Sequence, residues 1–229
     1  MTPERTELDD WTDDSDAEPR AGVDEAGKGP VLGSMFAACV VADPDDLPDD
    51  VDDSKDLNPE RREELASVIR ERAEAVAVSE ITVERIDDPE TDMNTLTVAA
   101  HAEALGPVAR DGLATYLDAG DTNAVRFERR VADRVEADLD LRAEHGADAS
   151  YPIVGAASIV AKVERDAHVA DLASEYGDLG SGYPGDSTTR EFLEDYIEAH
   201  GELPACARES WQTSRDVRNA AGQAALDDF

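Results

Sequence analysis

Two adjacent carboxylates followed at once by a Gly-Lys-Gly turn are the residues of this sequence best suited to chemistry. They lie in the stretch Asp24-Glu25-Ala26-Gly27-Lys28-Gly29-Pro30, which follows an apolar lead-in. Because adjacent side chains on a regular strand point to opposite faces, both carboxylates can serve one site only if the chain bends directly after them, and glycine permits such a bend. Carboxylate oxygens suit a divalent metal ion, whereas backbone N–H groups and an ammonium suit a phosphate. The stretch therefore indicates a site for metal and phosphate, and the alternative is an acidic strand end followed by a loop.

Two further aspartates lie at the ends of elements. Asp118 closes an apolar segment and opens the run Asp118-Ala119-Gly120-Asp121-Thr122-Asn123-Ala124, and Asp148 lies just before a segment that begins with small and apolar residues. Ligands gather at the carboxyl ends of strands in α/β sheets, and a helix N-terminus favours anions. In so acidic a chain either aspartate alone could be a solvated surface residue, but their order and context favour one shared site.

Hydrophobic patterning predicts the elements that must position these residues. We expect strands over residues 20–24, 31–42, 75–83, 112–117 and 139–144, and helices over 59–74, 92–109, 123–136, 151–176 and from 186 to 201. Paired strands followed by strands alternating with helices indicate an α/β fold with a mixed central sheet flanked by helices, plus C-terminal helices. We expect a disordered acidic tail over 1–19, a folded domain over 20–215 and a C-terminal tail over 216–229.

The charge of the chain argues at first against a nucleic-acid partner. There are 55 acidic and 21 basic residues among 229, so the net charge is −34, and only three of the basic residues are lysines, Lys28, Lys55 and Lys162. An apolar fraction of 41% with periodic segments excludes an acidic disordered protein. At about 1 M salt the Debye length falls to about 3 Å, so such a surface suits a salt-rich cytoplasm. We interpret the chain as a halophilic, archaeal protein whose stability rises toward molar KCl.

Other features narrow the class further. Cys39 and Cys206 have no metal or disulfide spacing, which predicts a reduced, cytoplasmic location. The four histidines lie far apart, and we expect surface or structural roles for them. No apolar run reaches the length of a membrane span. We therefore expect a cytoplasmic monomer with no membrane partner.

The motifs together resemble ribonuclease HII, the type II ribonuclease H family. The opening stretch is similar to the first family signature, the run from Asp118 to Ala124 with Phe127 to the second, and the run from Ala147 to Lys162 to the third. Three further elements resemble family motifs: Asp53-Ser54-Lys55, Gly180-Ser181-Gly182-Tyr183-Pro184 and the run from Arg208 to Trp211. The resemblance therefore spans about residues 21 to 213. All three lysines of the chain fall inside these motifs. The chain has Gly146 where family members usually carry lysine, and Lys28 where arginine is frequent.

The resemblance implies a ribonuclease H-like catalytic domain over 20–215. It implies hydrolysis of the RNA strand of RNA/DNA hybrids and incision at ribonucleotides embedded in duplex DNA, by two-metal-ion catalysis that leaves 5′-phosphate and 3′-hydroxyl ends. Asp24, Glu25, Asp118 and Asp148 would hold two Mg²⁺ or Mn²⁺ ions.

The same resemblance implies a set of substrate contacts. These residues are Gly27, Lys28, Gly29, Ser54, Lys55, Ser158, Lys162 and Tyr183, with the Gly-Lys-Gly turn and Tyr183 around the ribose 2′-hydroxyl. For Ser158 and Lys162 the alternative is helix packing and a solvated charge.

Two other functions compete with this interpretation. Ribonuclease HIII shares the opening motif, but it usually has an acidic residue where Pro30 stands and an extra N-terminal binding domain. A non-catalytic hybrid-binding or metal-binding protein is the second alternative, although a degenerate family member would be expected to lose a carboxylate.

The last seven residues suggest a protein partner. Gln223, Leu226 and Phe229 have the spacing of the peptide by which replication and repair enzymes dock on the sliding clamp, which they resemble. One helical turn places the apolar pair on one face. The usual peptide has two aromatics and this one has one, and the alternative is a frayed polar end.

Overall fold

A five-stranded mixed sheet forms the centre of the protein. The computed structural model describes residues 18–48, 50–51 and 57–227, with the side chains of 224–227 excluded. The strands are β1 (Arg20–Ala26), β2 (Met35–Ala42), β3 (Ala75–Ile81), β4 (Ala114–Asp118) and β5 (Asp140–Glu144), in the spatial order β3-β2-β1-β4-β5. The β1, β2 and β3 strands are antiparallel, whereas β4 runs parallel to β1 and to β5. The predicted α/β fold with a mixed central sheet is confirmed.

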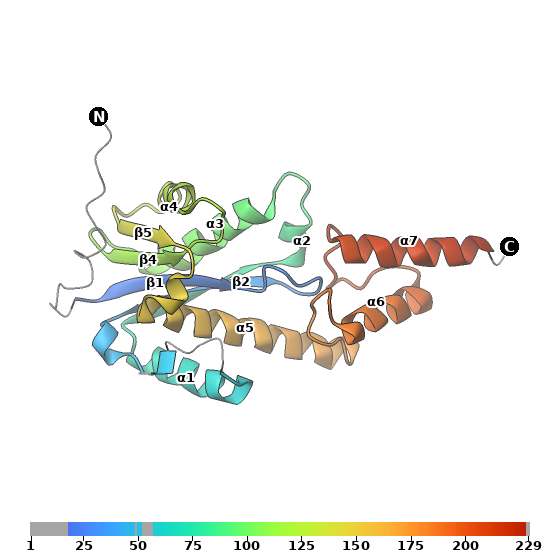
Figure 1. The fold of residues 1–229 in the computed structure, drawn as a ribbon, viewed down its shortest axis with the longest axis horizontal. Coiled ribbons are helices and arrows are strands. Elements are labelled where there is room, and N and C mark those ends of the chain that lie inside the picture. The colour runs from blue at the N-terminus through green and yellow to red at the C-terminus, as the bar shows by residue number, and fades with distance from the viewer. Residues whose placement is uncertain (1–17, 49, 52–56, 228–229) are drawn as a thin grey trace.

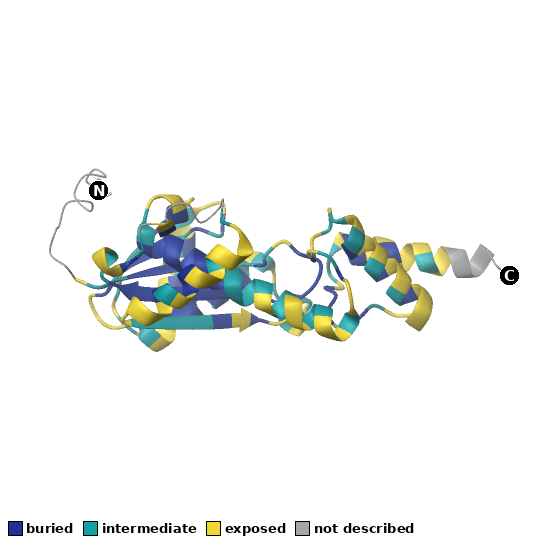
Figure 2. Cartoon of the chain, turned by 90° about the horizontal axis from the view of Figure 1, so that it is seen from below, coloured by how far each residue is buried: buried dark blue, intermediate teal, exposed yellow. Residues whose placement is uncertain are grey.

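Helices cover both faces of the sheet (Figure 1). One face packs against α3 (Met93–Leu105) and α4 (Ala124–Ala132), and the other against α5 (Pro152–Tyr176), which α1 (Pro59–Arg72) covers in turn. Buried positions follow the sheet and the inner faces of these helices (Figure 2). Among the helices of the described ranges, none combines the length and apolarity that a bilayer crossing requires.

A smaller C-terminal lobe lies beyond the end of the sheet, at the right of Figure 1. It consists of α6 (Ser187–His200) and α7 (Gln212–Asp227), which pack on each other around their own apolar cluster. The boundary that we expected at residue 215 falls inside α7, because helix packing on α6 continues the helix through the segment predicted as a tail. Residues 1–17 of the expected N-terminal tail lie outside the described residues.

Side-chain caps explain why the helices begin where the sequence predicts. Asn58, Asp92 and Asn123 each accept a hydrogen bond from a backbone N–H three residues later, at the N-termini of α1, α3 and α4. The predicted helix over 92–109 ends earlier, at Leu105, because a short 3₁₀ turn over Gly106–Val108 follows it. The short helix α2 (Val83–Ile86) was not predicted.

A glycine on β1 lets α5 lie unusually close to the sheet. A Cβ atom at Gly22 would come within 2.3 Å of the Ile153 carbonyl oxygen and 2.6 Å of the Val154 nitrogen. These are backbone atoms of the first turn of α5, so they cannot move aside as a flexible side chain would. The residues from Ile153 to Ala161 are all buried. The contact therefore fixes the start of α5 against the strand that carries Asp24 and Glu25.

We expect Gly22→Ala to destabilise the protein because its methyl group would push α5 off the sheet. The cost of such overpacking is about 1–3 kcal/mol of unfolding free energy, measured by denaturant titration in molar KCl. Gly222→Ala is the matched control, because Gly222 lies inside the helix α7 and nothing lies within 4 Å of the added methyl. Gly222→Ala should leave stability unchanged or raise it by up to about 1 kcal/mol. Equal stability of the two variants would contradict the close approach.

Candidate functional site

The four predicted carboxylates come from element ends that meet at one edge of the sheet. The register pairs Val23 of β1 with Leu117 of the parallel strand β4, so Asp24, Glu25 and Asp118 follow side by side. Asp148 lies in a one-turn 3₁₀ helix, Ala147–Ala149, between β5 and α5. The Ala147 N–H donates to Asp118 Oδ1 at 2.8 Å and ties this turn to the end of β4. Asp24 and Asp148 are 6% and 7% exposed.

Electrostatic coupling shows that these carboxylates lie close enough to repel one another. Burial raises the pKa of Asp24 well above its ordinary value, and the charges of Glu25 and Asp118 raise it further. Burial also raises the pKa of Asp118; the hydrogen bond from the Ala147 N–H opposes this rise, and the charges of Glu25 and Asp148 add to it. Such a cluster favours either protons or a compensating cation.

Three of the carboxylates have one oxygen held by a protein donor. Asp24 Oδ1 accepts from the Glu25 N–H at 2.7 Å, Asp118 Oδ1 accepts from Ala147, and Glu25 Oε2 lies 2.7 Å from His101 Nε2. The other Glu25 oxygen, Oε1, lies 4.0 Å from the Lys28 ammonium. Within the described ranges, no three acidic, histidine or cysteine side chains already converge with the geometry of a bound metal ion. The donor set itself, hard carboxylate oxygens in a buried cluster, fits Mg²⁺ or Mn²⁺.

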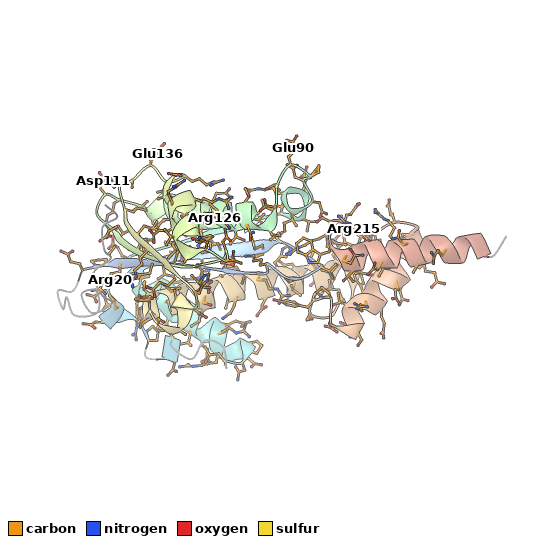
Figure 3. All side chains as sticks on the ribbon, turned by 45° about the horizontal axis from the view of Figure 1, so that its top comes forward. Arg20, Glu90, Asp111, Arg126, Glu136 and Arg215 are labelled. Atoms are coloured by element: carbon orange, nitrogen blue, oxygen red, sulfur yellow. The ribbon has the colours of Figure 1, made fainter. Side chains whose placement is uncertain are left out.

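Asp121 belongs to the same sequence motif as Asp118 but does not join the cluster. Its carboxylate is buried and pairs with Arg126, whose Nη2 lies 2.6 Å from Oδ2. Arg126 extends from the first turn of α4 (Figure 3). This hydrogen-bonded pair lowers the pKa of Asp121, in the direction opposite to Asp24 and Asp118. The motif thus contains Asp118, which lies in the carboxylate cluster, and Asp121, which pairs with Arg126 of α4.

A fully buried arginine holds the Gly-Lys-Gly turn in place. Arg208 donates from Nη2 to the Gly27 carbonyl at 2.6 Å, from Nη1 to the Lys28 carbonyl at 3.1 Å and from Nε to the Gly33 carbonyl at 2.8 Å. Trp211 stacks against the guanidinium and donates to the Gly29 carbonyl at 3.2 Å. Burial lowers the pKa of Arg208 to about 10. Because the carbonyl and the N–H of one planar trans peptide unit point in opposite directions, the Lys28 and Gly29 N–H groups face away from Arg208.

Beside this turn lies a cleft of about 350 Å³ in which basic side chains outnumber acidic ones four to two. Its lining consists of Glu25, Ala26, Gly27, Lys28, Gly29, Arg62, Lys162, Arg165, Asp166 and Tyr183. Asp166 fixes two of the cations, because its carboxylate pairs with Arg62 and with Arg165, each at 3.0 Å. In a chain of net charge −34, this local excess of cations marks a surface for an anion.

Tyr183 stands at the open side of the cleft, next to the turn. It is 44% exposed, one of two large apolar side chains with such exposure in the described part of the chain. The Arg165 guanidinium lies 5.2 Å from the ring centroid, and a Cβ atom on Gly29 would lie 3.6 Å from the ring. Arg165 also donates to the Ser181 carbonyl, which fixes the loop that carries Tyr183. The structure therefore brings Tyr183 and the Gly-Lys-Gly turn together, as the resemblance implies.

The remaining predicted residues divide into three groups. Lys28 points toward the carboxylates, donating to the Gly120 carbonyl with its Nζ 4.0 Å from Glu25 Oε1. Ser158 is buried beside Asp24, close enough to hold down the pKa of that carboxyl, yet its hydroxyl makes no hydrogen bond of normal geometry within the described structure. Ser54, Lys55 and Phe229 lie outside the described residues, as does the Leu226 side chain, and Gln223 is exposed on α7.

Sequence reasoning did not assign roles to several residues of the site. His101 was expected to be a surface or structural residue, whereas it is buried and contacts Glu25. Its helical spacing from Thr97 and Leu105, both on the buried face of α3, is the signal that could have indicated burial. Arg62 and Arg165 were not singled out, because arginine is the common basic residue of this chain. Gly146 stands where family members usually carry lysine. Its φ of 68° and ψ of 31° are left-handed, a conformation that glycine adopts readily.

We expect Asp24→Asn to stabilise the metal-free protein increasingly as pH rises. The folded-state pKa of Asp24 is raised. Its contribution to the free energy of unfolding is therefore fully present below the unfolded-state pKa of about 3.9 and is lost as pH rises through the folded-state pKa. The melting temperature of the variant minus that of the wild type, measured with chelator in molar KCl, should therefore increase from acidic to neutral pH.

Asp121→Asn provides the control of opposite sign. Because the folded-state pKa of Asp121 is lowered, its stabilisation is present above the unfolded pKa and is lost as pH falls through the folded value. The same temperature difference should therefore decrease as pH rises. Parallel slopes for the two variants would contradict the carboxylate repulsion described above.

Comparison with known proteins finds relatives that match most of the chain. The sequence matches the family described as ribonuclease HII over residues 21–214. A ribonuclease HII from Haloarcula marismortui is 68% identical over 210 residues, covering 92% of this chain and 100% of the relative. The crystal structure of ribonuclease H2 from Pyrococcus horikoshii aligns with a TM-score of 0.82 at 35% identity, covering 90% of this chain and 100% of that chain. Ribonuclease HII from Archaeoglobus fulgidus, solved in a complex with PCNA, aligns with a TM-score of 0.78 at 38% identity, over 85% of this chain and 96% of that one.

The matched range includes all four clustered carboxylates, the Gly-Lys-Gly turn and Arg208. It also coincides with the span over which the motifs resemble the family. The sequence analysis considered two related enzyme families, ribonuclease HII and ribonuclease HIII. The family match is to ribonuclease HII. The chain therefore belongs to the ribonuclease HII family of endoribonucleases.

Proposed function

We propose that this protein cleaves the RNA strand of RNA/DNA hybrids and incises duplex DNA at embedded ribonucleotides, with two divalent ions held by Asp24, Glu25, Asp118 and Asp148. The observation that carries the proposal is the cluster of buried and half-buried carboxylates beside a cleft lined with cations. Carboxylates alone could be a structural accident of an acidic chain, and a basic cleft alone could bind any anion. Their adjacency supports hydrolysis of a phosphodiester.

The metal ions fit the donor set of the site. Bound Mg²⁺ or Mn²⁺ would supply activation of the attacking water and stabilisation of the leaving 3′-oxygen. The protein's own part is to hold the carboxylate oxygens in position, through Ala147 for Asp118 and His101 for Glu25. Hydrolysis with this polarity leaves 5′-phosphate and 3′-hydroxyl ends.

The cleft residues would bind the substrate backbone and recognise ribose. Arg62, Lys162 and Arg165 line the cleft and would contact phosphates. The N–H groups of Gly27, Lys28 and Gly29, with the ring of Tyr183, would surround the 2′-hydroxyl that distinguishes RNA from DNA. Ser54 and Lys55 would add phosphate contacts from the segment outside the described residues. These short-range contacts explain how a chain of charge −34 binds a polyanion in high salt.

The direct test is cleavage of two labelled duplexes in molar KCl, one a continuous RNA/DNA hybrid and one a DNA with a single ribonucleotide. We expect cleavage of both with Mg²⁺ or Mn²⁺ and none with chelator. Asp118→Asn should lower the rate by at least about 100-fold, because removing a metal ligand removes much of the transition-state stabilisation. Asp121→Asn, with circular dichroism to confirm folding, should keep activity within a few-fold of wild type.

Two outcomes would reject the proposal. Wild-type activity of Asp118→Asn at saturating Mg²⁺ would show that the cluster is not the metal site. Binding of the hybrid without cleavage under any metal condition would instead identify a non-catalytic hybrid-binding protein.

We further propose that the C-terminal segment docks on a sliding clamp of the PCNA kind. The solved relative from Archaeoglobus fulgidus is described as a complex with PCNA, which supports the idea. In this chain, Gln223 is exposed on α7, and the helix continues to Asp227 at the end of the molecule farthest from the sheet (Figure 1). Docking through Gln223, Leu226 and Phe229 would therefore leave the carboxylate cluster accessible to a duplex.

Deletion of residues 223–229 should abolish clamp binding and leave hybrid cleavage unchanged. Calorimetry with the clamp of the same organism would measure the first, and the cleavage assay the second. Because one aromatic residue replaces the usual two, we expect modest affinity, on the order of micromolar. Asp227→Asn is the matched control and should bind like wild type, since position 227 is not one of the three docking positions. Equal affinity of the full-length and truncated chains would exclude docking through this segment.

A further inference from the structure

A buried histidine contacts one carboxylate of the cluster from a helix that carries none of the four carboxylates. His101 lies on α3, is fully buried, and places Nε2 2.7 Å from Glu25 Oε2. The contact crosses from a helix on one face of the sheet to the end of β1. It is therefore a tertiary contact that links the position of Glu25 to the packing of α3.

The surroundings of the ring determine which nitrogen carries the proton. His101 Nδ1 is buried and finds no hydrogen-bond partner in the part of the chain that the structure describes. A buried N–H without an acceptor costs more than a buried lone pair without a donor, because N–H groups are rarely left unpaired. The proton therefore belongs on Nε2, which donates to the Glu25 carboxylate. This assignment removes Nε2 as a metal ligand.

The His101 ring also packs against an aromatic side chain of another helix. It packs edge-on against Phe127 of α4, with the ring centroids 5.0 Å apart and the planes at 86°. On the same face of α3, the Thr97 methyl lies 2.4 Å from where a Cβ atom on Gly120 would stand, and that Cβ would lie 3.1 Å from Glu25 Oε1. Glu25 is thus confined between α3 and the loop after β4. With Oε2 held by His101, Oε1 is the oxygen directed toward the Lys28 ammonium, 4.0 Å away.

We propose that His101 is a positioning residue, which fixes Glu25 by donating from Nε2 and so prepares the carboxylate cluster for a divalent ion. The inference rests on the proposed function, because it assumes that Glu25 is a metal ligand. A hydrogen bond that fixes a metal ligand typically contributes about 10–100-fold to metal affinity. A His101 that merely filled the core beside Phe127 would contribute to stability and not to metal affinity.

The test compares three variants of the full chain, together with Asp24→Asn as the test of the metal site itself, by calorimetric titration with MnCl₂, without substrate, in molar KCl. His101→Phe keeps an aromatic ring for Phe127 but cannot donate, and it should weaken Mn²⁺ binding by about 10–100-fold. His101→Gln restores an N–H donor at a similar reach and should recover most of the affinity. Ser79→Ala is the matched control: it loses a buried hydrogen bond to the Ala100 carbonyl on the same helix, 2.7 Å long, without touching Glu25. Its Mn²⁺ affinity should equal that of wild type.

The outcomes separate this inference from the function on which it rests. If Asp24→Asn binds Mn²⁺ like wild type, the metal site itself is wrongly assigned. If Asp24→Asn loses binding while His101→Phe keeps wild-type affinity, or if Ser79→Ala loses as much affinity as His101→Phe, the positioning role of His101 is overturned.

A measurement on the wild type keeps the proposal testable should His101→Phe not fold. Nitrogen NMR of ¹⁵N-histidine-labelled protein reports which ring nitrogen is protonated. We expect a proton on Nε2 of His101, and a ring with no proton on Nε2 would overturn the inference.

Discussion

The burial of Asp24 beside the charges of Glu25 and Asp118 is the constraint that the surrounding structure must oppose. Desolvation and neighbouring charges raise the pKa of two of these carboxylates, so the folded protein keeps them together only because strong packing elsewhere fixes their backbones. Parallel pairing of β1 with β4 sets their spacing, and the close approach at Gly22 holds α5 against the same strand. Single donors from Ala147 and His101 then fix individual oxygens. The charged forms of Asp24 and Asp118 therefore destabilise the metal-free fold at this corner.

The same constraint accounts for the distribution of basic side chains. A surface of net charge −34 repels nucleic acid at low salt, and screening at molar salt removes this field beyond contact distance. Binding then depends on groups in direct contact, and four cations lie in the cleft beside the carboxylates. Buried Arg208 differs from the cations of the cleft, because its N–H groups donate to the carbonyls of the Gly-Lys-Gly turn. These hydrogen bonds orient the turn relative to the carboxylates and to the cleft.

Local signals in the sequence predicted much of this arrangement. Asn58, Asp92 and Asn123 lie at helix starts because capping is a local interaction. The order of the motifs predicted one shared site for Asp118, Asp148 and the first carboxylate pair, and the structure pairs the end of β4 with β1; that all four share one metal site stays a prediction. Contacts between distant segments were not predictable in the same way. His101 meets Glu25 across 76 positions, and Arg208 meets Gly27 across 181. The packing of α7 against α6 is likewise a contact between separate elements that no local pattern encodes.

Anomalous diffraction from crystals grown with Mn²⁺ would test the central claim most directly. If the carboxylate cluster is held together to bind cations, anomalous difference maps should show two peaks roughly 4 Å apart, bounded by Asp24, Glu25, Asp118 and Asp148. The Glu25 carboxylate should keep its contact with His101 Nε2. Density only at exposed surface carboxylates, with the cluster lacking any peak at saturating Mn²⁺, would contradict the account.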